Sequence, residues 1–492
     1  MAPLSLPLSV AVLLIQTTVA FNCSKAPIYV DIHKRAVQDS TVFQYGSFIG
    51  IGGTIEKNTA QNQSLWPSLS QNHTSFASRS YCDNSTLRDC IVSTGGFFNP
   101  DLSPTFQELN DFQTLDKGDN ASLKGFFGRD TLRLYTHYFE TDGAMQTLVE
   151  NTTVEVAESG SARPGVVGIG QDSTLLRDLA SRDLIGARTY SLYIGQGMDR
   201  AGGVVNGSNV FGGYDSGRFT GPAHRYSMNL QRMNPMTVRV KDIVIAENRE
   251  GGGNVSLFDP SAFPSMTSRP ETFEAELTTD QYPLSLPYDI TQNFISHLDA
   301  EPDNTWEDNS LKLKNPFNGT LSIVLEDGFT VTLPPEVLMN ASNITPIQER
   351  NESATTPFYL SAAFLGQVYL MADFESNAFF LAKAVQKNNV VMPETFCPKS
   401  TPEAWERPKQ SAWQKQGLIG AVVGGVIGGL GIAIFGYFFL IAYLRKREER
   451  KEEKELERGQ KAKIAQFEVE DAPPEFDPPP KTATPFLWKR PW

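Results

Sequence analysis

The chain has 492 residues, of which 40% are hydrophobic, so it is long enough to bury a substantial core in more than one lobe. Its formal net charge is −13, from 43 lysines and arginines against 56 aspartates and glutamates. Because DNA and RNA are polyanions, this charge argues against a nucleic-acid partner.

Residues 1–20 have the features of a secretory signal peptide. A largely apolar stretch, Leu4–Ile15, is followed by Thr18, Val19 and Ala20, small residues that suit cleavage by signal peptidase. We therefore expect residues 1–20 to be removed and a short N-terminal segment, residues 21–41, to open the mature chain.

Residues 42–384 alternate between short apolar runs and turn-forming residues. The runs include Val42–Ile51, Leu132–Phe139, Tyr190–Ile194, Thr237–Ile245, Leu321–Leu325 and Val368–Phe374. Gly, Pro, Asn, Asp or Ser separates such runs roughly every 8–12 residues, which is typical of all-β domains. Helical signals are short, at Ser173–Ser181 and Asp289–Leu298. We predict an all-β fold with a few short helices.

The chain has four cysteines, Cys23, Cys82, Cys90 and Cys397. An even number in an oxidising compartment suggests two disulfide bonds, and four cysteines allow three connectivities. The short interval makes Cys82–Cys90 the simplest pair. That choice leaves Cys23 to bond with Cys397 and to join the two ends of the region between them.

Residues 385–416 are polar and contain four prolines, so we predict a stalk there. Residues 417–444 follow, 28 residues without charge or proline, more than the ~20 that an α-helix needs to cross a bilayer. The basic cluster Arg445–Arg447 comes next and is of the kind that stays in the cytoplasm. We predict a single-pass type I protein with one transmembrane helix, residues 417–444. Its cytoplasmic tail, residues 445–492, is charged at first and then proline-rich and disordered.

The sequons for N-glycosylation agree with this topology, because all twelve precede the predicted membrane helix. They lie at Asn22, Asn62, Asn72, Asn84, Asn120, Asn151, Asn206, Asn254, Asn318, Asn340, Asn343 and Asn351. We expect a glycosylated ectodomain that is extracellular or luminal, at the plasma membrane or at an endomembrane such as that of the vacuole.

Two parts of the chain share one pattern. In each part, an apolar stretch ends in a turn of small polar residues, and further along the chain two apolar residues are followed by a glycine. In the first part, Ala60–Ser70 is followed by Gly165–Gly170. In the second part, Glu276–Pro287 is followed by Ala363–Gly366.

This repeat resembles the duplicated half of the pepsin-like aspartic peptidases. Further segments resemble motifs of that family in the family's order, and Cys82–Cys90 matches its small disulfide loop. These segments are Tyr190–Ile194, Val210–Asp215 with Arg218–Phe219, and Phe364–Asp373. The resemblance covers about residues 42–384 and implies a bilobed, pepsin-like double-barrel domain. Its lobes would comprise about residues 42–222 and 223–384.

The chemistry of that family needs two carboxylates, one from each lobe, which share a proton around a water molecule. Each carboxylate belongs to an Asp-Thr/Ser-Gly turn. In this chain Ser68-Leu69-Ser70 and Thr278-Thr279-Asp280 occupy the two triplets, so Ser68 and Thr278 stand where the resemblance implies aspartates. A hydroxyl group cannot be a general base near neutral pH. The segment Phe126–Asp130 lies near the place of the Tyr-Gly turn in the family's flap.

The leading hypothesis is therefore a membrane-anchored pseudopeptidase, a receptor or scaffold that binds a peptide or protein in the cleft between its lobes. One alternative is a divergent, active, membrane-anchored aspartic endopeptidase, and another is a glycan-coated spacer whose tail carries the function. No catalytic residue and no cofactor are assigned. The five histidines have no neighbouring ligand at metal-site spacing, so no metal site is expected.

Within the predicted membrane helix, Gly420, Gly424 and Gly428 recur at every fourth position, as do Gly425 and Gly429. Small residues at this spacing leave a face on which a second helix can lie closely. The sequence thus suggests a homodimer through Gly424 and Gly428, against the plainer reading that membrane helices tolerate glycine.

Overall fold

The computed structural model describes residues 21–37, 41, 43–53, 60–85, 87, 89–115, 122–136, 145–248, 252–339, 342–387, 390–406 and 412–467. The predicted signal peptide, the sequons at Asn120 and Asn340, and the tail beyond residue 467 lie outside the described residues. The chain divides into two compact units, one that ends at Trp405 and one that begins at Glu406.

The strands are β1 Ile28–Ala36, β2 Phe43–Ile51, β3 Gln61–Ser68, β4 Thr74–Ala77, β5 Gln107–Leu115, β6 Ser122–Thr136, β7 Met145–Gly160, β8 Val166–Gly168, β9 Thr189–Tyr193, β10 Gly207–Phe211, β11 Gly213–Asp215, β12 Phe219–Ser227, β13 Thr237–Glu247, β14 Asn254–Ser256, β15 Phe273–Leu277, β16 Ala300–Pro302, β17 Ser310–Leu313, β18 Gly319–Leu325, β19 Thr330–Leu333, β20 Ile344–Gln348, β21 Tyr359–Leu360, β22 Val368–Asp373, β23 Ala378–Ala384 and β24 Pro393–Thr395. The helices are α1 Arg79–Asn84, α2 Cys90–Ser93, α3 Thr174–Ser181, α4 Tyr288–Leu298, α5 Pro335–Leu338, α6 Ala362–Leu365 and α7 Ala412–Phe467, with 3₁₀ turns η1 Pro100–Leu102 and η2 Ser216–Arg218.

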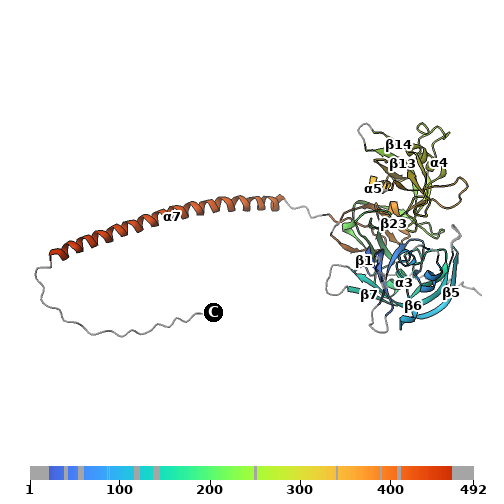
Figure 1. Cartoon of the computed structure of the whole chain (residues 1–492), viewed down its shortest axis with the longest axis horizontal. Coiled ribbons are helices and arrows are strands. Elements are labelled where there is room, and N and C mark those ends of the chain that lie inside the picture. Colours follow the sequence, from blue (N-terminus) through green and yellow to red (C-terminus); the bar gives the residue numbers. More distant parts are fainter. Residues whose placement is uncertain are drawn as a thin grey trace, which may run out of the picture. The chain divides into compact units, whose positions relative to one another are not determined.

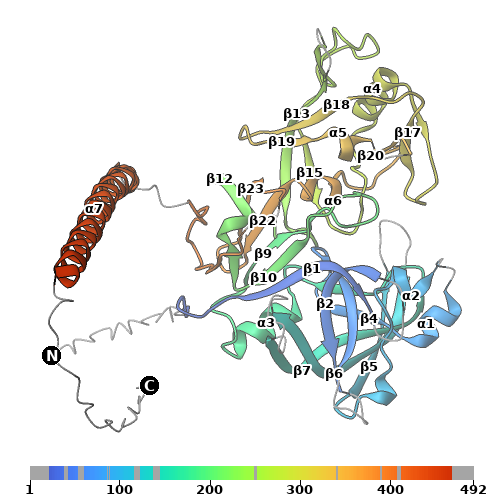
Figure 2. The same cartoon turned by 60° about the vertical axis from the view of Figure 1, so that its left-hand side comes forward.

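The first unit is built from β-sheets with short helices, which confirms the predicted all-β class (Figure 1). Its largest sheet has the strand order β12-β23-β22-β9-β10-β1-β2-β3-β8-β4-β7-β6-β5, and a second sheet has the order β19-β18-β13-β15-β21 with β14 beside β13. Strands β13 and β18 with α4 lie at one end of the body, and β5, β6 and β7 lie at the other (Figure 2). Strands β9, β10, β22 and β23 lie between these two lobes (Figure 2).

Burial along each strand follows from its place in the sheets. In β18, Leu321, Ile323 and Leu325 are buried and the residues between them are half-buried, the period of two that a strand has when only one face meets the core. In contrast, all six residues of β22 are buried, because this strand lies between β23 and β9 in the middle of the molecule.

The folded body begins earlier than residue 42, the boundary expected from the sequence. Strand β1 lies inside the largest sheet, where Ile28–Ile32 pairs with β10 and Ile32–Ala36 pairs with β2. Ile28, Val30 and Ile32 are buried in the main core. The segment expected to precede the domain is therefore one of its central strands.

The folded body also ends later than residue 384, so the prediction of a stalk at residues 385–416 is wrong for its first part. Strand β24 pairs with β11, and Phe396 is buried in a core cluster with Tyr369 and Phe380. The amide of Trp405 donates a hydrogen bond to the carbonyl oxygen of Ser216. This polar, proline-rich segment therefore packs against the folded body, because it contains apolar side chains such as Phe396 that are buried there.

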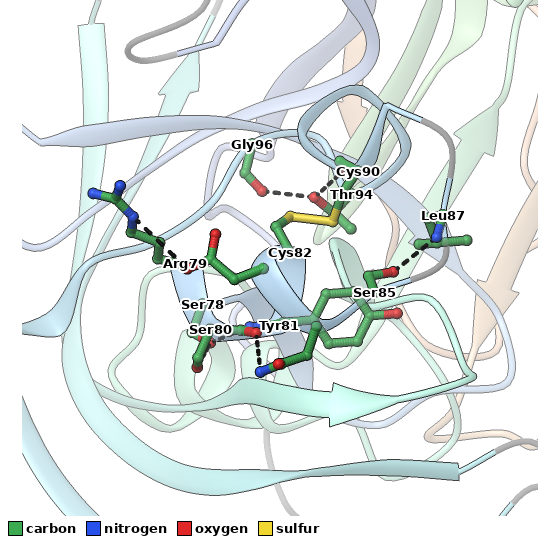
Figure 3. The surroundings of a disulfide bond; sticks show 12 residues. Ser78, Arg79, Ser80, Tyr81, Cys82, Ser85, Leu87, Cys90, Thr94 and Gly96 are labelled. Atoms are coloured by element: carbon green, nitrogen blue, oxygen red, sulfur yellow. Dashed lines mark hydrogen bonds and ion pairs between the residues drawn. A yellow bond between two sulfur atoms is a disulfide. The ribbon is translucent and has the colours of Figure 1, made fainter.

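Two disulfide bonds are present, and they join the expected pairs. Cys23 bonds with Cys397, 374 residues away, and Cys82 bonds with Cys90, eight residues away. Figure 3 shows the second bond between α1 and the start of α2. The buried Tyr81 anchors α1 there, and its hydroxyl donates to the carbonyl oxygen of Ala162 (2.7 Å).

The helix described in the second unit is α7, which is continuous from Ala412 to Phe467. It contains the one candidate membrane span found in the described chain, with a mean hydropathy of 2.1 over its most apolar window. The helix continues without a break into the charged sequence that starts at Arg445. The predicted membrane segment and the juxtamembrane segment are therefore one element.

Candidate functional site

Two turns lie at equivalent places in the two lobes. Strand β3 ends at Ser68, and its partner β8 runs parallel to it, with Ser68 opposite Gly168. Strand β15 ends at Leu277, just before Thr278, and its parallel partner is β21, with Leu277 opposite Leu360. Each of the turns Ser68–Ser70 and Thr278–Asp280 thus follows a strand that has a parallel neighbour. The repeat seen in the sequence corresponds to these two equivalent arrangements.

The second half of the repeat differs from the expectation. The apolar pair that lies parallel to β15 is Tyr359-Leu360, followed by Ser361, and it is not Ala363–Gly366. Residues Ala362–Leu365 instead form helix α6. The repeat requires a glycine after two apolar residues, and in this part of the chain only Leu365 is followed by one. The true counterpart of Gly168 is Ser361, which has no such glycine to mark it.

The two turns contact each other directly. The hydroxyl of Ser70 donates a hydrogen bond of 2.6 Å to Oδ2 of Asp280, and the amide N–H of Leu69 donates to Oγ1 of Thr279 (3.3 Å). The indole N–H of Trp66 donates to the carbonyl oxygen of Thr279 (2.8 Å). Three hydrogen bonds therefore hold the end of β3 against the turn of the other lobe.

The contact between the turns is asymmetric. Thr279 accepts from the backbone of the first turn, but its counterpart Leu69 has no hydroxyl with which to accept from the second turn. The Leu69 side chain is instead fully buried in the main core. The two turns therefore occupy equivalent positions in their lobes, but the central side chain of one accepts a hydrogen bond and that of the other packs in the core.

Hydroxyl groups lie where the two turns begin. Oγ of Ser68 lies 3.3 Å from Oγ of Ser70 and accepts from the amide of Gln71 (3.3 Å). Oγ1 of Thr278 accepts from the amide of Asp280 (3.1 Å). Both Ser68 and Thr278 are buried. Asp280 is the single carboxylate in the two triplets, and its Oδ2 is the acceptor for Ser70, so this site can hold polar groups but has no pair of acids.

A cationic side chain joins the segments around the second turn. The guanidinium of Arg200, which lies between β9 and β10, stands over the rings of Tyr282 (4.9 Å) and Trp306 (5.1 Å). It also donates to Oδ2 of Asp308 (2.9 Å) and to the hydroxyl of Ser310. Sequence reasoning missed this residue, because an arginine in a glycine-rich loop carries no signal for burial.

The segment near the expected flap turn is not a turn. Phe126–Asp130 lies within β6, and the buried Asp130 carboxylate accepts from the hydroxyls of Ser103 (2.7 Å) and Thr105 (2.6 Å). Residues 116–121, which connect β5 and β6, lie outside the described residues.

The sequons differ in exposure. Among the described ones, Asn22, Asn84, Asn151, Asn206, Asn254, Asn318 and Asn351 are exposed. Asn62, Asn72 and Asn343 are half-buried. The amide oxygen of Asn72 accepts from the amide of Asp172 (2.9 Å), so this side chain, close to the first turn, supports the loop before α3. Within the described ranges no three His, Cys, Asp or Glu side chains converge as a metal site.

A carboxyl group that sequence reasoning also missed lies in the first lobe, three strands along the sheet from β3. Glu155 of β7 is buried, with 6% of its surface exposed, and burial raises the pKa of its carboxyl group to about 7. The alternation Val154-Glu155-Val156 predicts an outward glutamate. Its burial depends on other strands, which a local pattern does not reveal.

Comparisons with known proteins agree with this architecture. The family model for the eukaryotic aspartyl proteases matches residues 75–384, so it includes the second turn and begins just after the first. Rhizopuspepsin-4 of Rhizopus niveus is 28% identical over 151 residues, which are 28% of this chain and 34% of that protein. Rhizopuspepsin-3 of the same organism is 26% identical over 211 residues, which are 40% of this chain and 45% of that protein.

The matches to these relatives span less than half of the relatives' own length. The family model, however, matches more than half of this chain and covers both lobes. The parallel strand pairs, the cross-lobe turns and this match lead to one conclusion: the chain belongs to the eukaryotic aspartyl protease family.

Proposed function

We propose that this protein is a non-catalytic member of its family, anchored in a membrane, that binds a peptide or protein in the cleft between its lobes. The pepsin-like fold has a cleft for peptide binding, and α7 is a candidate membrane helix. The observation that carries the proposal is the pair of turns that face each other with Ser68 and Thr278 at their starts.

Catalysis in this fold depends on two carboxylates that hold different protonation states. General acid–base catalysis typically contributes ~10²–10⁴-fold, and the hydroxyls of Ser68 and Thr278 supply neither an acid nor a base near neutral pH. Asp280 has Ser70 as its cross-lobe neighbour at 2.6 Å, which is a hydroxyl and not a second acid. This arrangement supports binding without cleavage.

The full-length protein is expected to cleave no peptide between pH 3 and 7, although it retains the fold that presents the cleft. A digest of a peptide library, read by mass spectrometry with and without pepstatin, measures this. An active rhizopuspepsin serves as the positive control. Pepstatin-sensitive cleavage at acid pH that is lost in Asp280→Ala would establish the alternative, a divergent aspartic endopeptidase with Asp280 as its acid or base.

We further propose a type I orientation, with the folded body extracellular or luminal and the chain beyond Arg445 in the cytoplasm. Support comes from the charge at the end of the apolar segment, from the two disulfide bonds and from the seven exposed sequons. We also propose that two copies associate through Gly424 and Gly428; among the described residues, a Cβ at either glycine would have no atom within 4 Å.

Luciferase fragments fused after Trp492 of two full-length copies test orientation and self-association together. We expect complementation that resists protease added outside intact cells and that falls in the double variant Gly424→Ile/Gly428→Ile. The control is Gly436→Ile. Its side chain points about 120° around the helix axis from that of Gly424, so this variant should keep the signal. An unchanged signal in the double variant contradicts dimerisation through this face, and a protease-sensitive signal contradicts the orientation.

A further inference from the structure

The buried Glu155 lies near two polar side chains, Ser75 and His73, each with an atom that has no hydrogen bond to a described residue. Strand register places Ser75 of β4 opposite it on one side and Phe127 of β6 opposite it on the other. The Phe127 ring contacts the ring of His73 (centroids 5.1 Å apart), so His73 lies on the same side of the sheet as Glu155. The hydroxyl of Ser75 and Nδ1 of His73 are buried and have no hydrogen bond with any residue that the structure describes.

The Glu155 carboxyl group has neither a hydrogen bond nor an ion pair with any described residue, and burial alone accounts for its raised pKa of about 7. A buried acid normally has a partner, because burying an unpaired charge is costly. The cations on the adjacent β6 and α3 are Lys124, Arg129, Arg133 and Arg177. Lys124 and Arg129 are exposed, Arg133 donates to the carbonyl oxygen of Gly52, and Arg177 lowers the pKa of His73 together with burial, the larger cause. None of these four cations has an ion pair with Glu155.

This cluster is connected to the first turn through the backbone. A Cβ built on Gly168, which lies opposite Ser68, would be 2.5 Å from the carbonyl oxygen of His73. Glu155 is three strand spacings, about 14 Å, from Trp66, along β3, β8, β4 and β7. An extended peptide advances about 3.3 Å per residue, so this distance corresponds to about four peptide residues.

Glu155, Ser75 and His73 can all accept hydrogen bonds from a ligand that carries a primary ammonium group. A primary ammonium has three N–H donors. The carboxylate of Glu155, Oγ of Ser75 and Nδ1 of a neutral His73 can each accept one of them. The half-buried rings of Phe112 and Phe127, 5.1 Å apart, supply an apolar wall for a methylene stem. A lysine side chain has both parts.

We propose that Glu155, Ser75 and His73 form a subsite for the ammonium group of a lysine side chain in the bound peptide, about four residues from the position over the two turns. This inference rests on the proposed peptide-binding function. The bound ammonium completes the hydrogen bonds of all three groups and neutralises Glu155. The subsite therefore selects among peptides without any catalytic step.

Two pools of capped octapeptides test the subsite on the full-length protein in nanodiscs. Each peptide of one pool contains a single lysine, and each peptide of the other has norleucine there, which keeps the stem and lacks the ammonium. At pH 8 the lysine pool is expected to bind about tenfold more tightly by fluorescence polarisation, as a desolvated charge pair would give. Glu155→Gln should remove this preference, and Glu158→Gln, which changes an exposed acid of the same strand, should keep it.

A second measurement separates the subsite from the peptide-binding function. n-Butylammonium chloride should raise the melting temperature at pH 8 in the unmodified protein more than in Glu155→Gln. Measurable and equal binding of the two pools, or no such difference with n-butylammonium, overturns the subsite. If neither pool binds but n-butylammonium stabilises only the protein that has Glu155, the subsite stands and the proposed function is wrong.

Discussion

The double variant Cys23→Ser/Cys397→Ser should lose about 6 kcal/mol of unfolding free energy, because this bond closes a loop of 374 residues and the entropy of the unfolded chain rises with loop length. The bond also joins Cys23 to the segment after β24, where Oγ1 of Thr395 donates to the carbonyl oxygen of Lys25 (2.6 Å). Denaturant titration of the full-length protein without reductant, followed by tryptophan fluorescence, measures the change in unfolding free energy.

The second disulfide provides a matched control. The double variant Cys82→Ser/Cys90→Ser opens a loop of only eight residues and should lose about 2.5 kcal/mol by the same relation. Equal losses in the two double variants, or a larger loss for the short loop, would contradict this account of the long bond.

Glu155→Gln should change how the stability of the folded body depends on pH. The carboxyl pKa rises from 4.5 in the unfolded chain to about 7 in the folded one, so the folded state holds a proton that the unfolded state has lost. The unmodified protein should therefore lose about 3 kcal/mol of stability as pH rises from 4.5 to 8, at about 1.4 kcal/mol per unit of pKa difference.

Glutamine keeps the shape of the protonated acid and cannot ionise, so the variant should match the parent at pH 4 and be more stable by about 3 kcal/mol at pH 8. Melting temperatures and denaturant midpoints across this pH range measure the difference. Glu158→Gln, on the exposed side of β7, should follow the parent at every pH. A parent whose stability does not fall between pH 4.5 and 8 would show that Glu155 has a partner in solution.

Local sequence patterns were sufficient to predict those features that depend on residues close together in the chain. The alternation in β18 gives its buried face, and the short spacing of Cys82 and Cys90 gives their bond. The resemblance to the family placed Ser68 and Thr278 at the starts of two turns that the structure brings together. These features follow from strand period, loop length and motif order.

The errors arose where distant segments decide the outcome. Residues 390–405 are polar and proline-rich, yet they are ordered because β11 and Ser216 supply hydrogen bonds to them. Strand β21 has only two residues, too few for a pattern, and its place is set by β15. Glu155 is buried because Ser75 and Phe127 arrive beside it from two other strands. No window of a few residues contains that information.

The bond between Cys23 and Cys397 also determines what a protease can release. A cut at any single peptide bond between these residues leaves one piece with Cys23 and one with Cys397, and the disulfide still joins them. The piece with Cys397 continues into α7. A nicked folded body therefore stays covalently attached to its helix until the disulfide is reduced, and release of the intact folded body requires a cut on the C-terminal side of Cys397.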